Sequence, residues 1–272
     1  AFGDLLHHLI GSRSLVWNLA KNDIKKKFAG SYFGVVWAFV QPVITVLLYW
    51  FVFEKGLNSK ATDLRTGIEI PFVLWLTAGL VPWFYFQEAL NGGTGVLVEY
   101  SYLVKKVVFQ IDMLPVVKMI SALFTHLFFV AFTIVLFICM GYMPDWYALQ
   151  VVYYSFCMIL FATGLVYATS AVTVFFRDMK EVVGILLQIG MWVTPIMWNF
   201  ETMVQIPGWA IAVLKLNPMY YIVSGYRNAL INHIGFWEDM GLTVYFWVVT
   251  AVILFLGTTV FKRLRPHFAD VL

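Results

Sequence analysis

The sequence predicts an all-α integral membrane protein with six transmembrane helices, an N-terminal amphipathic interfacial helix and a re-entrant helical hairpin between helices five and six. The composition is 61% hydrophobic and 12% charged, whereas a soluble domain is about half apolar and a quarter charged. Six apolar segments are long enough to cross a bilayer as helices. Lys and Arg residues gather in the segments that this topology leaves on one side.

We expect a single transmembrane domain over residues 1–272, because no Ser- or Pro-rich linker divides the chain. It comprises a cytoplasmic arm (1–33), a six-span core (34–261) and a cytoplasmic tail (262–272). The first residues lack the pattern of a removable signal peptide. A net charge of +3 is too small to indicate a nucleic-acid partner. Both cysteines, Cys139 and Cys157, fall in predicted spans and are expected to be packed thiols.

The N-terminal arm contains a predicted amphipathic helix. Apolar side chains follow one helical stripe and polar or basic ones follow another, which is typical of a helix lying on anionic headgroups. The residues expected at this interface are Trp17, Lys21, Ile24, Lys25 and Phe28. Asp23 and Lys27 interrupt the apolar side. Three adjacent lysines, Lys25 to Lys27, come before the first apolar segment and place its beginning in the cytoplasm.

The six predicted spans have nearly the same length as a bilayer-crossing helix or exceed it. They cover residues 34–53, 71–90, 116–141, 147–175, 183–199 and 242–261. With the N-terminus inside, thirteen Lys and Arg residues lie on the cytoplasmic side and five outside. This bias favours cytoplasmic placement of both termini. Small residues in the fourth span, including Gly164, favour close packing against another helix.

Residues 206–231 are apolar enough to enter the membrane, but Asn217-Pro218 divides them into two short pieces. Pieces of roughly 11 and 14 residues suit re-entrant or interfacial helices. A seventh span here would place the basic tail, which includes Lys262 and Arg265, outside the cell. We therefore expect a hairpin that dips in from the outer face. Such backbone is tolerated where it is buried in protein or lines a cavity.

The absence of several sequence motifs excludes some functions for this chain. The sequence has no G-x-x-x-x-G-K-[ST] motif for ATP, no H-E-x-x-H motif and no zinc-like Cys/His spacing. The chain is therefore expected to bind no metal or cofactor of its own. Glu88, in the second span, is either functional or an interfacial residue at the helix end, and both interpretations stay open. His126 is either a proton relay or a hydrogen-bonded packing residue.

The loop between the second and third predicted spans mixes apolar and basic residues. Leu103, Val104 and Val107 flank Lys105 and Lys106. A short helix of this kind suits a groove on another protein. The alternative is an interfacial helix lying on lipid.

Aromatic residues are dense in the second span and in the predicted hairpin. They either form interfacial belts or line a pathway for a glycan, since sugars stack on aromatic faces. Together with the acidic residue of the second span, the candidate path residues are Trp75, Trp83, Phe84, Tyr85, Glu88, Tyr220 and Tyr221.

Four segments, in order along nearly the whole chain, resemble the type-2 ABC exporter permeases. They are FAGSYFGVVWAFVQPVITVLLYWFVF, SYLVKKVVFQIDMLP, FFRDMKEVV and NPMYYIVSGYRNALI. Within that family the chain is similar to the polysaccharide branch, which exports O-antigen and wall teichoic acid.

The resemblance implies a homodimer in a bacterial plasma membrane with two copies of a separate ATPase, which would bind ATP and Mg. It implies that a polymer on a polyprenyl diphosphate carrier passes between the two permease subunits. The family's coupling helix corresponds to Tyr102–Gln110, and its hairpin to Pro207–Ile231. The implied ATPase-coupling residues are Tyr102, Leu103, Val104, Lys105, Lys106, Val107, Arg177 and Asp178.

Three other functions are alternatives to export of a lipid-linked polymer. A type-2 permease for a drug or small lipid would share the topology, but the dense aromatic residues favour a glycan. A membrane glycosyl- or acyltransferase needs a catalytic cluster of Asp, Glu or His residues at a membrane face, and the sequence has none. A passive channel leaves the docking-like inner loop unexplained.

Overall fold

The computed structural model describes residues 13–27, 29, 32–105, 110–198 and 207–272, and within these ranges the chain is mostly helical. The long helices are α3 (Trp37–Trp50, continued by a π-helical turn Phe51–Gly56), α4 (Phe72–Thr94), α7 (Met113–Cys139), α8 (Gln150–Phe175) and α12 (Met240–Leu264). The shorter helices are α2 (Arg13–Lys27), α5 (Val96–Glu99), α6 (Ser101–Val104), α9 (Met179–Val193), α10 (Gly208–Lys215), α11 (Pro218–Arg227) and α13 (Phe268–Val271). A small antiparallel hairpin joins β1 (Ala61–Thr62) to β2 (Glu69–Ile70).

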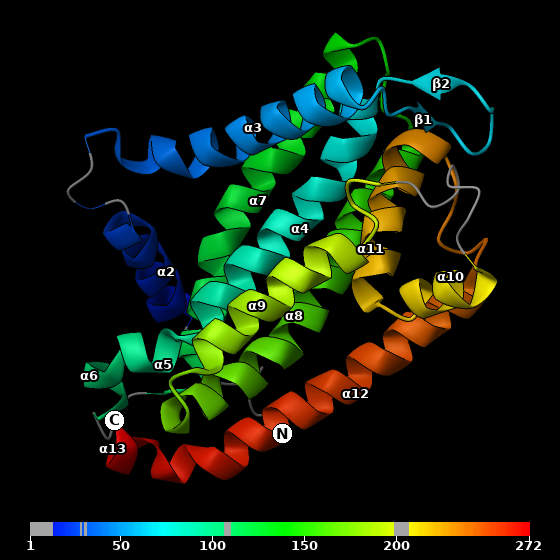
Figure 1. The fold of residues 1–272 in the computed structure, drawn as a ribbon. Helices are drawn as coiled ribbons and strands as arrows, with labels where there is room; N and C mark the ends of the chain where they lie inside the picture. Colours follow the sequence, from blue (N-terminus) through cyan, green and yellow to red (C-terminus); the bar gives the residue numbers. More distant parts are fainter. Residues whose placement is uncertain (1–12, 28, 30–31, 106–109, 199–206) are drawn as a thin grey trace.

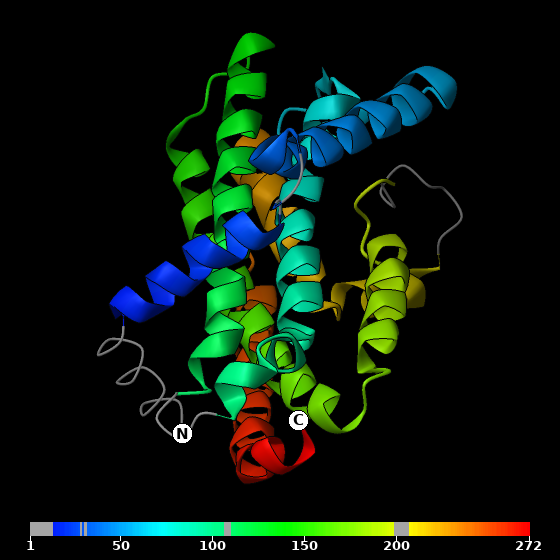
Figure 2. The same cartoon turned by 90° about the vertical axis from the view of Figure 1, so that its left-hand side faces the viewer.

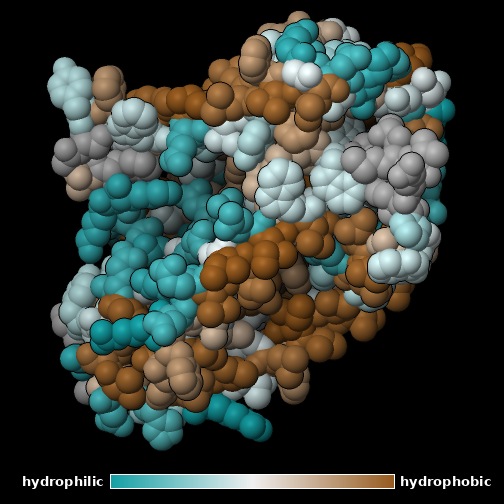
Figure 3. All heavy atoms as spheres, in the orientation of Figure 1, coloured by the Kyte–Doolittle hydropathy of each residue, from teal (hydrophilic) through white to brown (hydrophobic). Residues whose placement is uncertain are grey.

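Helix α4 lies at the centre of the bundle, in contact with α3, α7, α8, α9 and α11 (Figure 1). Most of its side chains are buried. Helix α3 is different, because it crosses α7 and the first part of α4 and then leaves the bundle (Figure 2). Val46 is the buried side chain of α3. Figure 3 shows apolar side chains along α3 and over α9 and α12, with polar side chains between these two bands.

Four helical segments of the described chain are long and apolar enough to cross a membrane, which indicates a multi-pass membrane protein. They are Trp37–Gly56, Met113–Cys139, Trp146–Phe175 and Met240–Val271. Helices α4 and α9 match two further expected spans in position, but neither meets both the length and the hydropathy of the other four. The count of six spans therefore stays a prediction. The expected helix to residue 199 is wrong, because α9 ends at Val193 and Thr194, the residue before Pro195, has the extended backbone that a proline imposes.

The predicted break at Asn217-Pro218 is confirmed. Helix α10 ends at Lys215, and the Asn217 side chain caps α11 by accepting a hydrogen bond from the Met219 N–H at 3.0 Å. Pro218 occupies the first turn of α11, where a proline is tolerated. The Asn217 side-chain amide also donates to the Thr194 hydroxyl at 2.7 Å. The two helices are present, and their entry into the membrane from one face stays a prediction.

Helices α8 and α12 approach closely through two glycines, as the small residues of the fourth predicted span indicate. A Cβ atom on Gly164 would lie 2.8 Å from the backbone of Ile253, and one on Gly257 would lie 2.0 Å from the carbonyl oxygen of Gly164. Real Cβ atoms do not reach such distances. The two backbones can therefore meet only because both positions lack a side chain.

Gly257→Leu is expected to lower the thermal unfolding temperature of the detergent-purified protein, because the new side chain forces α8 and α12 apart. Overpacking of this kind costs on the order of 1–3 kcal/mol. Gly184→Leu is the matched control, since a Cβ atom there meets no atom within 4 Å. Equal unfolding temperatures for the two variants would contradict this account of the α8–α12 contact.

Candidate functional site

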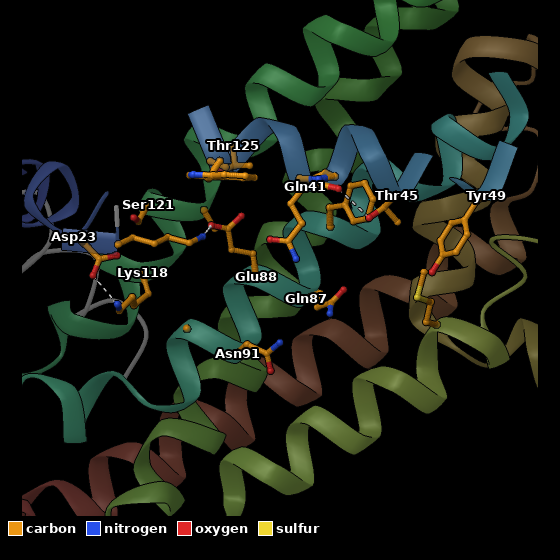
Figure 4. A pocket seen from close by; sticks show the side chains of 18 residues that line it. Asp23, Gln41, Thr45, Tyr49, Gln87, Glu88, Asn91, Lys118, Ser121 and Thr125 are labelled. Atoms are coloured by element: carbon orange, nitrogen blue, oxygen red, sulfur yellow. Dashed lines mark hydrogen bonds and ion pairs between the residues drawn. The ribbon is translucent and has the colours of Figure 1, made fainter. Parts of the chain in front are cut away.

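A cavity of about 730 Å³ lies between α2, α3, α4, α7 and α9 (Figure 4). We call it the inner cavity. Its wall combines three kinds of side chain. Amides come from Gln41, Gln87 and Asn91, and hydroxyls from Thr45, Ser121 and Thr125. Aromatic rings come from Trp37, Tyr49 and Phe84, and charges from Asp23, Lys27, Glu88 and Lys118.

The charged groups of this wall form ion pairs. Lys118 Nζ lies 2.6 Å from Asp23 Oδ1 and 2.8 Å from Glu99 Oε2. The Lys118 and Asp23 side chains are 13% and 7% exposed, so this pair is shielded from water. Lys27 pairs with Glu88 in a more exposed contact at the edge of α4. Glu88 is thus one partner of an ion pair that joins α2 to α4.

Tyr100 completes the buried ion group. Its hydroxyl donates a hydrogen bond to Asp23 Oδ1 at 2.9 Å. Burial, with the neighbouring Asp23 carboxylate, raises the pKa of Tyr100 well above its ordinary value, so the phenol keeps its proton and acts as a donor. The ammonium groups of Lys26 and Lys118 lie 5.0 and 5.6 Å from the centre of its ring. The group connects α2 with α5 and α7.

These contacts correct the amphipathic pattern expected for the N-terminal helix. The buried face of α2 consists of Val16, Ala20 and Asp23, and it packs against Met113 and Val117 of α7. Asp23 therefore belongs to the inward face instead of interrupting an apolar one. Local sequence does not reveal this pairing, because the partner of Asp23, Lys118, lies 95 residues away.

The other residues predicted to lie at the membrane interface differ in their exposure. Trp17 is 45% exposed, with Lys21 Nζ 5.3 Å from its ring and Phe124 of α7 beside it. Lys25 is exposed and Ile24 half-buried. Phe28 lies outside the described residues. Contact of this helix with lipid stays a prediction.

The predicted path residues do not form one group. Phe84 and Glu88 line the inner cavity. Trp75 and Tyr220 line a separate pocket of about 240 Å³. Trp83, Tyr85 and Tyr221 are buried in the helix packing. The Tyr85 hydroxyl donates to the Met119 carbonyl, and the Tyr221 hydroxyl lies 3.0 Å from that of Tyr153.

Arg227 of α11 is a buried charged residue that was not among the candidate site residues predicted from the sequence. It is 6% exposed and donates hydrogen bonds of 2.7 Å to the carbonyls of Pro195 and Ile196. Its guanidinium carbon lies 3.3 Å from the centre of the Trp75 ring. This side chain joins α11, α4 and the segment after α9. The adjacent Trp75 face is occupied by Arg227.

His126 is part of a buried hydrogen-bonded cluster. Its Nε2 atom lies 3.2 Å from the Ser155 hydroxyl and 3.1 Å from the Tyr226 hydroxyl. These three residues come from α7, α8 and α11. The arrangement favours the interpretation of His126 as a packing residue that joins helices.

The predicted coupling residues are only partly on the surface. Tyr102 is 53% exposed, and Lys105 is exposed. Leu103 is half-buried, and Lys106 and Val107 lie outside the described residues. Arg177 and Asp178 are exposed in the turn between α8 and α9, at the same end of the bundle as α6 and α13 (Figure 1).

The expectation that Val104 is available for docking is wrong in this structure. Val104 is 3% exposed and belongs to a buried cluster that includes Leu97, Leu114 and Tyr167. The loop turns this side chain inward because α6 packs against the ends of α7 and α8. Tyr102 of α6 and Lys105, which follows α6, thus face outward.

The polar residues of the inner cavity were also missed from the sequence, although α4 carries a signal for them. Gln87 and Asn91 are one helical turn apart in a mostly apolar helix. Residues spaced by four lie on the same helix face. That spacing alone did not reveal that α3 and α7 would supply the opposite polar walls.

Lys118→Ala is expected to lower the unfolding temperature of the purified protein much more than Lys27→Ala. Removing Lys118 leaves the buried Asp23 carboxylate without its cation, which costs on the order of 3–5 kcal/mol. Removing Lys27 breaks an exposed pair worth about 0–1 kcal/mol. The comparison is made by thermal unfolding in one detergent. Similar losses for both variants would show that the buried ion group does not stabilise the fold.

Comparison with known proteins identifies the family. The family model of ABC-2 type transporters matches residues 14–231. The O-antigen export system permease protein RfbA of Myxococcus xanthus is 25% identical over 266 residues, which cover 98% of each chain. The permease of the same name from Klebsiella pneumoniae is 20% identical over 258 residues, which cover 93% of each chain. The chain belongs to the ABC-2 type transporter family.

Proposed function

We propose that this chain is the transmembrane subunit of an ATP-driven exporter that moves a lipid-linked cell-envelope polymer from the cytoplasmic to the outer side of the bacterial plasma membrane. The polymer is an O-antigen or teichoic-acid type polysaccharide on a polyprenyl diphosphate carrier. The observation that carries the proposal is the similarity to O-antigen export permeases along 93–98% of both chains. A match of that extent covers nearly the whole chain.

The inner cavity supports the same function. It places amides, hydroxyls and aromatic rings between helices that include two of the apolar candidate spans, Trp37–Gly56 and Met113–Cys139. A pathway for a glycan needs hydrogen-bonding groups and ring faces in one place. Such a cavity is not needed for a helix bundle that only anchors a partner in the membrane.

The proposed assembly is a homodimer with two copies of a separate ATPase, and both termini are cytoplasmic. ATP and Mg bind to the ATPase. Tyr102, Lys105, Arg177 and Asp178 form the proposed docking surface, because they are exposed and lie at one end of the bundle. This is also the end at which the basic C-terminal part of α12 lies, as expected for a cytoplasmic face.

The function is tested by deleting the gene in its native host and complementing it. Deletion is expected to abolish surface polymer while the lipid-linked polymer accumulates inside, because synthesis continues without export. Surface polymer is measured by antiserum on intact cells, and internal polymer on permeabilised cells. Unchanged surface polymer in the deletion strain would overturn the proposal.

Arg177→Glu is expected to weaken co-purification of the ATPase by at least about fivefold, since a reversed charge at an electrostatically complementary interface costs on the order of several kcal/mol. Lys60→Glu is the control, because it changes the same charge on an exposed residue next to β1, far along the chain from the docking surface. Both variants are compared at equal membrane levels. Full recovery of the ATPase with Arg177→Glu would remove this turn from the docking surface.

A further inference from the structure

We propose that the segment after α12 positions the two stretches of chain on which the ATPase docks. This segment, Arg265–Val271, consists of a 3-10 turn (Arg265–His267) and helix α13 (Phe268–Val271). The inference rests on the proposed function, because it concerns the proposed docking surface. One docking stretch lies between α4 and α7 and carries Tyr102 and Lys105. The other is the turn between α8 and α9, with Arg177 and Asp178.

Phe268 anchors the segment beside the turn between α8 and α9. Its side chain is completely buried, whereas the residues on either side of it are exposed. The centre of its ring lies 5.4 Å from that of Phe261 and 6.2 Å from that of Phe175. Phe175 is the last residue of α8, two positions before Arg177. The ring of Phe268 therefore packs at the point where this docking stretch begins.

The same ring belongs to the buried cluster beneath the other docking stretch. That cluster includes Leu97 of α5 and Val104 of α6 together with Phe268. Val104 is buried, while Tyr102 and Lys105 on either side of it face outward. Helix geometry sets the directions of neighbouring side chains, so the burial of one determines where the others point. The direction of Tyr102 thus depends on a cluster that the segment after α12 helps to fill.

An ion pair connects the segment to the end of this same stretch. Arg265 Nη1 lies 2.8 Å from Asp112 Oδ2, and the two side chains are 37% and 12% exposed. Asp112 directly precedes α7, and its carbonyl accepts a hydrogen bond of 2.6 Å from the Tyr167 hydroxyl of α8. A carboxylate shielded from water is destabilising without its cation. This pair therefore holds the segment after α12 against the starting point of α7.

The two docking stretches come from different parts of the chain, and one partner must bind both. A surface whose parts are already fixed binds with a smaller loss of conformational freedom. Figure 1 shows α13 at the same end of the bundle as α5 and α6. Phe268 and Arg265 make contacts on both sides, so the segment can fix the relative position of the two stretches. We therefore describe Arg265 and Phe268 as positioning residues.

Limited trypsin digestion of the purified permease tests the role of Phe268. In Phe268→Ala we expect cleavage at Lys105 and Arg177 to become at least about tenfold faster, because loss of a buried ring favours opening of both stretches and cleavage follows the open population. Cleavage at Lys60, next to β1, is the internal reference and is expected to stay unchanged. Val271→Ala is the control variant, since Val271 is 46% exposed in the same segment.

Two outcomes of the digestion would overturn the proposal. The first is unchanged cleavage at Lys105 and Arg177 in Phe268→Ala. The second is equal acceleration at Lys60, which would show that the ring stabilises the whole fold and does not position the docking stretches. If Phe268→Ala does not accumulate in the membrane, the ion-pair variants below decide the question.

The ion pair is tested by charge reversal and rescue. Arg265→Glu is expected to lower co-purification of the ATPase at least about fivefold, because it places two carboxylates side by side. Combining it with Asp112→Arg remakes the pair in the opposite direction and is expected to restore most of the recovery. Full recovery with Arg265→Glu alone would overturn the proposal. Absence of rescue would also overturn it, because Arg265 would then contact the ATPase itself.

Failure of the proposed function gives a different pattern. In that case the unaltered permease recovers no ATPase, and deletion of the gene leaves surface polymer intact. The digestion is carried out on the permease alone, so its result separates a wrong assignment of the segment from a wrong assignment of the exporter.

Discussion

The arrangement of this protein around its inner cavity depends on the burial of one lysine between two carboxylates. Lys118 Nζ contacts Asp23 of α2 and Glu99 of α5, and Tyr100 donates to the same Asp23 oxygen. Charges removed from water must be paired, and removing one partner strands the other. This requirement holds α2 against α7 and fixes the segment between α4 and α7. Two walls of the cavity, α2 and α7, are therefore fixed relative to each other by this ion group.

A second buried cation, Arg227, joins α11 to α4 and to the segment after α9. Arg227 is bound by the carbonyls of Pro195 and Ile196 and covers the Trp75 ring. The planar guanidinium can do this because it presents several donors in a fixed geometry and stacks on an aromatic face. The carbonyls of these two residues, which follow α9, are thereby satisfied. Helices α4 and α11 and the segment after α9 meet at this residue, and the smaller pocket is lined by the same residues.

Much of the helical architecture was predictable from local sequence. The apolar segments, the break at Asn217-Pro218 and the close approach at Gly164 follow from hydropathy, proline chemistry and residue size. The end of α9 at Val193 was missed because hydropathy continues past Thr194-Pro195 although the helix cannot. Val104 was missed because a short apolar run has no period that tells its buried face from its exposed one. Of the candidate path residues, Phe84 and Glu88 line the inner cavity, whereas its amide wall was not foreseen.

The sequence by itself determined that this is a helical membrane protein related to export permeases, because composition, span length and the order of segments are properties of the chain alone. Only the tertiary structure decided which polar residues act together. Asp23 and Lys118 are 95 positions apart, and Gln41, Gln87 and Ser121 come from three different helices. Helix periodicity gives the face on which a residue lies, and packing gives the partner on the opposite face. Helix packing therefore decides which polar groups meet in the inner cavity.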